Sequence, residues 1–237
     1  MFKEISRERG VSRCGWSWAG KFVDLDNNGH LDLVVGNGFI SASRKKSYWY
    51  FLGTLGSSDR MVTQDVVNWP PIGDASLGGY QNACVFYNDG KGRFENVVRS
   101  TGMGNDLSDE RGIALIDFKN NGSQSLAIAN QNQVMKFYEV IQRNDNRWIG
   151  FKLVGTKSNR DAFGAFMRVT MTDGSKLSRQ LQTMNTYGSQ SDSRLHFGLG
   201  IKSTIQSIFL RWPSGNVQEF SGDHFALNKY HLVTEKP

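Results

Sequence analysis

One segment, KFVDLDNNGHLDLVVGNGF at residues 21–39, constrains the fold more than any other part of the chain. Its centre carries side chains with oxygen atoms at alternate positions, and the spacing lengthens after Gly29. Apolar and β-branched residues flank this polar centre on both sides, a pattern typical of β-strands. The segment therefore predicts two strands joined by an acidic loop.

The composition of this loop predicts a calcium site. Oxygen ligands around a glycine that permits a sharp turn suit a hard cation such as Ca²⁺, whereas an imidazole nitrogen is a poor ligand for it. The expected ligands are the backbone carbonyl of His30 and the side-chain oxygens of Asp24, Asp26, Asn28 and Asp32. An EF-hand is not expected, because Val35 stands where the closing Glu of that loop would be. The alternative is an acidic turn without metal, since Asp, Asn and Gly are common in turns.

The composition predicts a globular β protein. The chain has 237 residues, of which 12% are aromatic and 21% charged, with 26 Gly but only 4 Pro. No apolar run reaches the roughly 20 residues that span a bilayer, and the first ten residues, MFKEISRERG, do not form a signal peptide. The net charge is +6, but the only dense basic cluster is residues 44–46. We interpret that cluster as a solvated loop and expect no nucleic-acid partner.

The two cysteines, Cys14 and Cys84, fit no CxxC metal or redox pattern. They can pair across adjacent strands in an oxidising compartment, and two buried free thiols are equally consistent with the sequence.

A weak internal repeat places a second, altered loop later in the chain. The segment FENV at residues 94–97 matches FKEI at residues 2–5, and a second strand–loop–strand pattern follows at residues 114–130. In this second loop Asp117 and Asn121 stand where Asp24 and Asn28 stand in the first, but Lys119 and Ser125 replace the other two acidic positions. We therefore expect the second loop to bind no metal, with Lys119 taking the place of the ion.

Between the two units lies an insertion at about residues 41–83. It contains the aromatic run YWYF at residues 48–51 and a turn-rich stretch around Trp69. These aromatic residues either form an exposed binding surface, as is common at interfaces, or pack the insertion onto the main body, which is the interpretation we prefer. Two strands joined by a tight Asn-Asp-Gly turn are predicted at residues 85–94.

From Trp148 onward, apolar and polar residues alternate between short turns, which predicts a compact antiparallel β module. The best catalytic candidate in this module is His196, which Ser189, Ser191, Asp192 and Ser193 precede. No GxSxG motif is present and His196 lies in a predicted strand, so we expect a structural, hydrogen-bonded histidine and no catalytic residue. His224 and His231 are isolated in the sequence.

Two family resemblances follow from these motifs. The acidic loop with its flanking strands resembles the FG-GAP/VCBS repeats of integrin-like β-propellers, over roughly residues 1–140. The segments NRDAFGA, QSDSRLHFGLG and RWPSG, at residues 159–165, 190–200 and 211–215, resemble the ASPIC/UnbV module. That module typically follows FG-GAP repeats in proteins similar to cartilage acidic protein and its bacterial relatives.

The sequence and these resemblances together predict an all-β fold, with a partial integrin-like propeller at residues 1–145 and an ASPIC/UnbV-like β domain at residues 146–237. The resemblance implies a non-enzymatic, calcium-binding recognition or scaffold protein with a protein partner or a larger assembly. A carbohydrate-binding module that uses Trp49 and Trp69 is the alternative, and a hydrolase is a second one. The expected location is extracellular, cell-surface or periplasmic, provided that the full-length protein carries a signal peptide. Two repeat units cannot close a propeller, which needs at least four blades.

Overall fold

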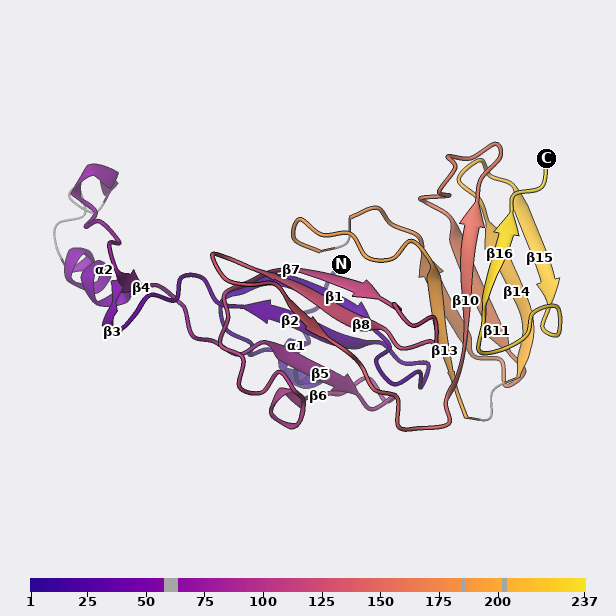
Figure 1. The fold of residues 1–237 in the computed structure, drawn as a ribbon, viewed down its shortest axis with the longest axis horizontal. Helices are drawn as coiled ribbons and strands as arrows, with labels where there is room; N and C mark the ends of the chain where they lie inside the picture. Colours follow the sequence, from indigo (N-terminus) through magenta and orange to yellow (C-terminus); the bar gives the residue numbers. More distant parts are fainter. Residues whose placement is uncertain (58–63, 185, 202–203) are drawn as a thin grey trace.

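The computed structural model describes residues 1–57, 64–184, 186–201 and 204–237, so residues 58–63 of the expected insertion lie outside the described residues. Strands predominate, as the composition predicts, and the fold is all-β. Figure 1 shows three parts in a row: an arm, a central pair of sheets, and a C-terminal pair of sheets.

The first central sheet has the strand order β1-β2-β5-β6, with antiparallel neighbours. Its strands are β1 (Ser17–Val23), β2 (Asp32–Asn37), β5 (Cys84–Asn88) and β6 (Phe94–Asn96). Alternate residues of β1 are buried, as the sequence pattern predicts. The short helix α1 (Ser6–Arg9) precedes the sheet, and Cys14 forms a disulfide with Cys84 of β5. The structure thus selects the disulfide from the two alternatives that the sequence left open.

The second central sheet has the order β7-β8-β9 and packs against the first. Its strands are β7 (Glu110–Ile116), β8 (Ser125–Asn130) and β9 (Lys136–Tyr138), and the 3₁₀ turn η2 (Val98–Ser100) leads from one sheet to the other. The two sheets share one apolar core, to which β2 contributes Val34, β5 contributes Val85, and the second sheet contributes Ile113 and Ile128. This shared core fixes the positions of the two acidic loops relative to each other.

The insertion forms an arm between β2 and β5 that projects away from the central sheets (Figure 1). Its elements are β3 (Ser43–Ser47), α2 (Tyr48–Gly56), η1 (Val66–Asn68) and β4 (Ala75–Ser76). The aromatic run begins helix α2. Some of its residues are packed in a core and others are exposed, so both of the expected roles are represented. Tyr48 is buried in a small core with Ala75 and Leu77, whereas Trp49 and Tyr50 are exposed.

The C-terminal part consists of two further sheets around a separate core. The strand orders are β13-β10-β16 and β12-β11-β14-β15. The strands are β10 (Arg147–Val154), β11 (Phe166–Met171), β12 (Lys176–Gln180), β13 (Leu195–Gly200), β14 (Ile205–Arg211), β15 (Val217–Ser221) and β16 (Tyr230–Thr234). The expected module is wholly antiparallel, but β10 and β16 pair in parallel. A long return of the chain brings the last strand alongside β10, and local alternation of residues cannot predict such a pairing.

Among the described residues no closed barrel or propeller forms, and no helix is both long and apolar enough to cross a membrane.

Candidate metal centre

The acidic loop connects β1 to β2 and is organised by the carboxylate of Asp24. Its Oδ1 accepts a hydrogen bond from the backbone N–H of Asn28 at 3.0 Å, and its Oδ2 accepts one from Gly29 at 2.9 Å. The turn also requires left-handed backbone at Asn27, where φ is 59°, and at Gly29, where φ is 92°. Asn and Gly adopt that conformation at the lowest cost.

Asp32 closes the loop and anchors it to the neighbouring strand. It is fully buried; its Oδ2 accepts from Leu25 N at 3.0 Å, and its Oδ1 accepts from Asn88 N at 2.8 Å. Because Asn88 ends β5, this one carboxylate fixes the loop to two strands of the first sheet.

The remaining expected ligands lie on the outer side of the loop. Asp26 and Asn28 are half-buried and each contacts the hydroxyl of Tyr87, at 3.3 Å. His30 is exposed, and its backbone N–H donates to Asn28 Oδ1 at 2.7 Å. The loop thus carries three carboxylates and one amide, with Asp24 and Asp32 buried and Asp26 and Asn28 on its outer side.

Burial makes the two inner carboxylates costly to ionise without a cation. It raises the pKa of Asp24 to about 7 and that of Asp32 to about 6, although backbone N–H donors oppose both shifts. The negative charge of Asp26 raises both pKa values further. A bound cation would offset this repulsion, and oxygen side chains are the ligand type that hard divalent ions take.

The protein nevertheless holds the loop with its own hydrogen bonds. In the part of the chain that the structure describes, no three carboxylate, imidazole or thiol side chains are grouped so that they could hold a metal ion. The expected set would complete its coordination with the amide of Asn28 and a backbone carbonyl. Each carboxylate oxygen that accepts an N–H keeps a second lone pair for an ion.

The second loop repeats the backbone arrangement of the first without its ligand set. Asp117 Oδ1 accepts from Asn121 N at 3.1 Å and Oδ2 accepts from Gly122 N, the pattern that Asp24 makes with Asn28 and Gly29. The expectation that Lys119 takes the place of an ion is wrong, because its ammonium pairs with Glu139, which directly follows β9. The two loops thus share the same Asp–backbone hydrogen bonds although their other side chains differ.

The first loop packs against strand β13 of the C-terminal sheets and is hydrogen-bonded to the second loop. Gly200 N donates to the carbonyl of Asn27 at 2.9 Å, and the Asn27 side chain donates to the carbonyl of Gly122 at 3.1 Å. Asn27 therefore links the first loop, the second loop and β13. A side chain at position 198 would collide with Asp24 and Asn27, so only glycine permits this close approach.

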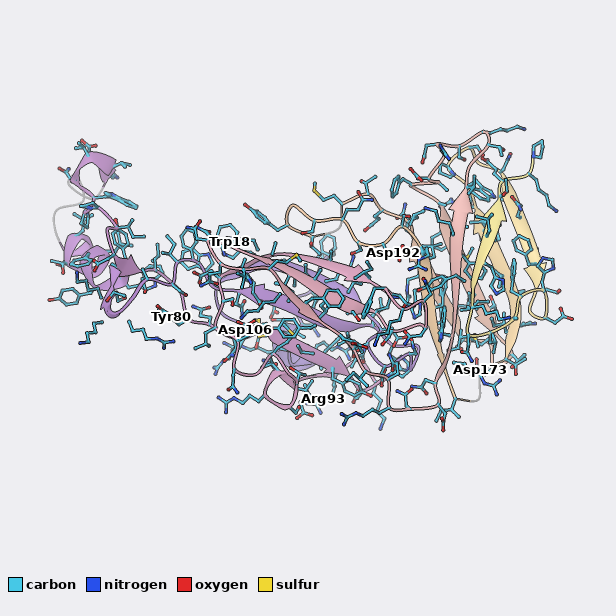
Figure 2. The ribbon with its side chains drawn as sticks, in the orientation of Figure 1. Trp18, Tyr80, Arg93, Asp106, Asp173 and Asp192 are labelled. Carbon is cyan, nitrogen blue, oxygen red and sulfur yellow. A yellow bond between two sulfur atoms is a disulfide. The ribbon has the colours of Figure 1, made fainter. Side chains whose placement is uncertain are left out.

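A second set of contacts joins the second loop to the residues just before β13 and to the first residue of β16. Arg194 Nη2 donates to the carbonyl of Asp117 at 3.0 Å and its Nε donates to Asp192 Oδ2 at 2.7 Å. The guanidinium of Arg194 also lies 3.8 Å from the ring centre of Tyr230, whose hydroxyl donates to Asp117 Oδ2 at 2.9 Å. Figure 2 shows Asp192 at this junction between the central and C-terminal sheets.

The comparison with known families bears on these contacts. Residues 155–237 match the ASPIC and UnbV family model. The match confirms the resemblance of the C-terminal part, and it covers β11 to β16. No curated protein matches the chain.

Within the ASPIC and UnbV region, His196 contributes to the junction. Its Nε2 lies 2.7 Å from Asn27 Oδ1, its ring stacks on Trp148 at 5.4 Å, and burial lowers its pKa to about 3. Ser191 accepts a hydrogen bond from Leu115 N, and Ser193 accepts one from Lys152. The polar residues of QSDSRLHFGLG thus contact the central sheets and β10, and His196 faces an amide.

Sequence reasoning identified the residues of the acidic loop but not the contacts that join the loops to the C-terminal sheets. Asn27 was not among the expected ligands because it falls between them in the alternating pattern. A signal for its role existed in the closely spaced glycines of the HFGLG sequence, since glycines within a strand often mark a close approach of another backbone.

Proposed function

We propose that the chain is a calcium-binding, non-enzymatic recognition or scaffold protein, and that its two central sheets are FG-GAP/VCBS-like blades of an incomplete β-propeller. Two observations support the propeller assignment. The sheets follow each other in the chain and share a core, and each contains an Asp loop with the same backbone hydrogen bonds.

The observation that carries the calcium assignment is the position of Asp24 and Asp32. Two buried carboxylates with raised pKa values lie in one loop with a third carboxylate, and Ca²⁺ is the cation that suits oxygen ligands at this spacing. When bound, the ion would neutralise these charges and stiffen a loop that contacts β5 and β13. The chain's own residues then orient the loops and hold the sheets together.

The proposed recognition surface is the arm. Trp49 is 51% exposed, Tyr50 is 76% exposed and Trp69 is 45% exposed, and aromatic side chains of this kind are enriched at protein interfaces.

A glycan partner is the second candidate, because the faces of exposed Trp49 and Trp69 also suit stacking on sugars. A glycan array with the native chain and the Trp69→Ala variant separates the two, since protein recognition gives no saccharide signal.

The disulfide between Cys14 and Cys84 supports an extracellular, cell-surface or periplasmic location. Disulfides persist in oxidising compartments and are rare in the cytosol.

Calorimetric titration with Ca²⁺ tests the proposed metal centre. We expect one site in the native chain and a loss of affinity of at least about tenfold in Asp26→Asn, which corresponds to about 1.4 kcal/mol. Asp26 is the informative position, because Asn preserves its size and an oxygen for the N–H of Asn28 while removing the charge. The matched control is Asp173→Asn in an exposed turn of the C-terminal sheets. Equal heats for the native chain and Asp26→Asn would refute the assignment.

A further inference from the structure

A cavity of about 270 Å³ lies between the first central sheet and the ASPIC and UnbV region. Strand β1, the end of β12 and the segment that leads into β13 line it. Four leucines, Leu31, Leu115, Leu181 and Leu195, form part of the lining. The cavity is therefore partly apolar and has room for a small molecule.

Lys21 is the most unusual residue of this lining. It is only 8% exposed, and in the part of the chain that the structure describes no hydrogen bond or ion pair reaches its ammonium. Burial lowers its pKa to about 8. An unpaired buried charge is costly, and the repeat places Ala114 at the corresponding position of the second unit. The strand therefore does not require a lysine at this position in order to fold.

A second cation with an unused donor lines the same cavity. Arg179 of β12 donates from Nη1 to the carbonyl of Ser178 at 2.9 Å and lies 5.4 Å from the ring centre of Phe197. Its Nη2 is buried without a hydrogen-bond partner. Lys21 and Arg179 thus bring two positive charges from separate parts of the fold to one cavity.

The negative charges around the cavity are already engaged. Asp192 pairs with Arg194. Asp24 accepts backbone N–H groups of the acidic loop with both oxygens and is also attracted to Arg179, so it offsets one of the two positive charges of Lys21 and Arg179. No salt bridge reaches Arg179 within the described residues. The cavity therefore has donors and positive charge for one further anion.

We propose that this cavity is a binding site for a small organic acid, whose carboxylate pairs with Lys21 and Arg179 and whose apolar body packs on the leucines of the lining. A carboxylate matches the excess charge of the two cations without requiring the full donor shell of inorganic phosphate. Of the proposed calcium ligands Asp24 alone lines the cavity, and neither Lys21 nor Arg179 is a calcium ligand, so the site is testable whether or not the acidic loop binds Ca²⁺.

Reductive methylation of the intact chain, followed by peptide mass spectrometry, tests the site directly. Formaldehyde and an amine–borane are small and carry no carboxylate, so they report the accessibility of Lys21 without competing for the site. We expect benzoate, lactate or succinate at constant ionic strength to slow methylation of Lys21 at least fivefold in a saturable manner. Exposed Lys176, on the same strand as Arg179, serves as the internal control and keeps its rate.

Melting temperatures provide a second readout that does not depend on the reactivity of Lys21. Lys21→Met should melt higher than the native chain without ligand, because it removes a buried unpaired charge, and it should lose the stabilisation by the organic acid. Arg179→Gln should weaken that stabilisation, whereas Lys176→Met should retain it. The proposal is overturned if none of the three acids stabilises the native chain more than Lys21→Met, or if phosphate alone does so.

Discussion

Glu110 shows how a single residue imposes a pH dependence on the central sheets. It begins β7, is only 1% exposed, and its Oε2 accepts a hydrogen bond from Asn37 N at 3.2 Å. Burial raises its pKa to about 8, and the charge of nearby Asp106 raises it further, while Asn37 and Lys136 oppose the shift. The folded protein therefore holds a proton on Glu110 that the unfolded chain loses near pH 4.

From this shift we predict that the native chain loses stability as the pH rises from about 4 to about 8, because ionisation of Glu110 is easier in the unfolded state. Glu110→Gln mimics the protonated acid and should remove this contribution. The difference in unfolding free energy between the variant and the native chain should grow by roughly 3 kcal/mol between pH 5 and pH 8, at about 1.4 kcal/mol per unit of pKa shift.

Urea unfolding at the two pH values measures this difference. Comparing the variant with the native chain cancels the other shifted groups, which include Asp24 and His196. Glu95→Gln, at an exposed position of β6, is the control and should show no such growth. A pH-independent difference for Glu110→Gln would mean that Glu110 is ionised in the folded chain.

Single residues also mark the limit of sequence reasoning at the metal centre. The alternating oxygen side chains of the loop are local, and therefore the sequence could reveal Asp24 and Asp32 as candidates. Their burial depends on Asn88 of β5 and on Gly198 of β13, which are distant in the chain. The buried Lys21 was undetectable for the same reason, since its environment consists of residues from several segments that are far apart in the chain.

At the scale of elements, the junction depends on the close approach of β13 to the acidic loop. A Cβ atom at position 198 would lie 2.5 Å from Asn27 Cα and would also collide with Asp24 Oδ2. We predict that Gly198→Ala lowers the unfolding free energy by about 2 to 3 kcal/mol, as expected for overpacking. It should also weaken Ca²⁺ binding, because the displaced atoms include a proposed ligand.

Gly102→Ala is the matched control for this prediction. A Cβ atom at position 102 meets nothing within 4 Å, and this glycine does not have a left-handed backbone conformation. Chemical denaturation and calcium titration of both variants provide the comparison. If Gly198→Ala were as stable as Gly102→Ala, β13 would not contact the loop in solution as it does in the structure.

The sequence predicted individual elements better than their pairing. Both strand–loop–strand units and the hairpin after the insertion follow from residue alternation and turn residues, and β5 and β6 do pair as a hairpin. The hairpin loop is longer than the predicted tight turn, because Asn88 pairs with Phe94. Helix α2 was missed because its aromatic residues favour strands and are weak helix formers. The parallel pairing of β10 with β16 was missed because it joins strands at opposite ends of the C-terminal part.

At the scale of the whole molecule, the acidic loops couple two cores that are otherwise separate. One core lies between the central sheets and the other between the C-terminal sheets. Between them lie the two loops, Asn27 and the segment that leads into β13. Because the proposed calcium ligands lie at this junction, the ion should stabilise both parts together.

We therefore predict that saturating Ca²⁺ raises the melting temperature of the native chain in a single calorimetric transition. A ligand at a hundred times its Kd stabilises the folded state by about 2.7 kcal/mol, which corresponds to a rise of roughly 5 to 10 °C for a chain of this size. In Asp26→Asn this rise should fall to about half or less at the same calcium concentration, because a tenfold weaker site stabilises by only about 1.4 kcal/mol, while Asp173→Asn should retain it. Two transitions, of which calcium shifts only one, would show that the central and C-terminal sheets unfold independently and that the junction does not couple them.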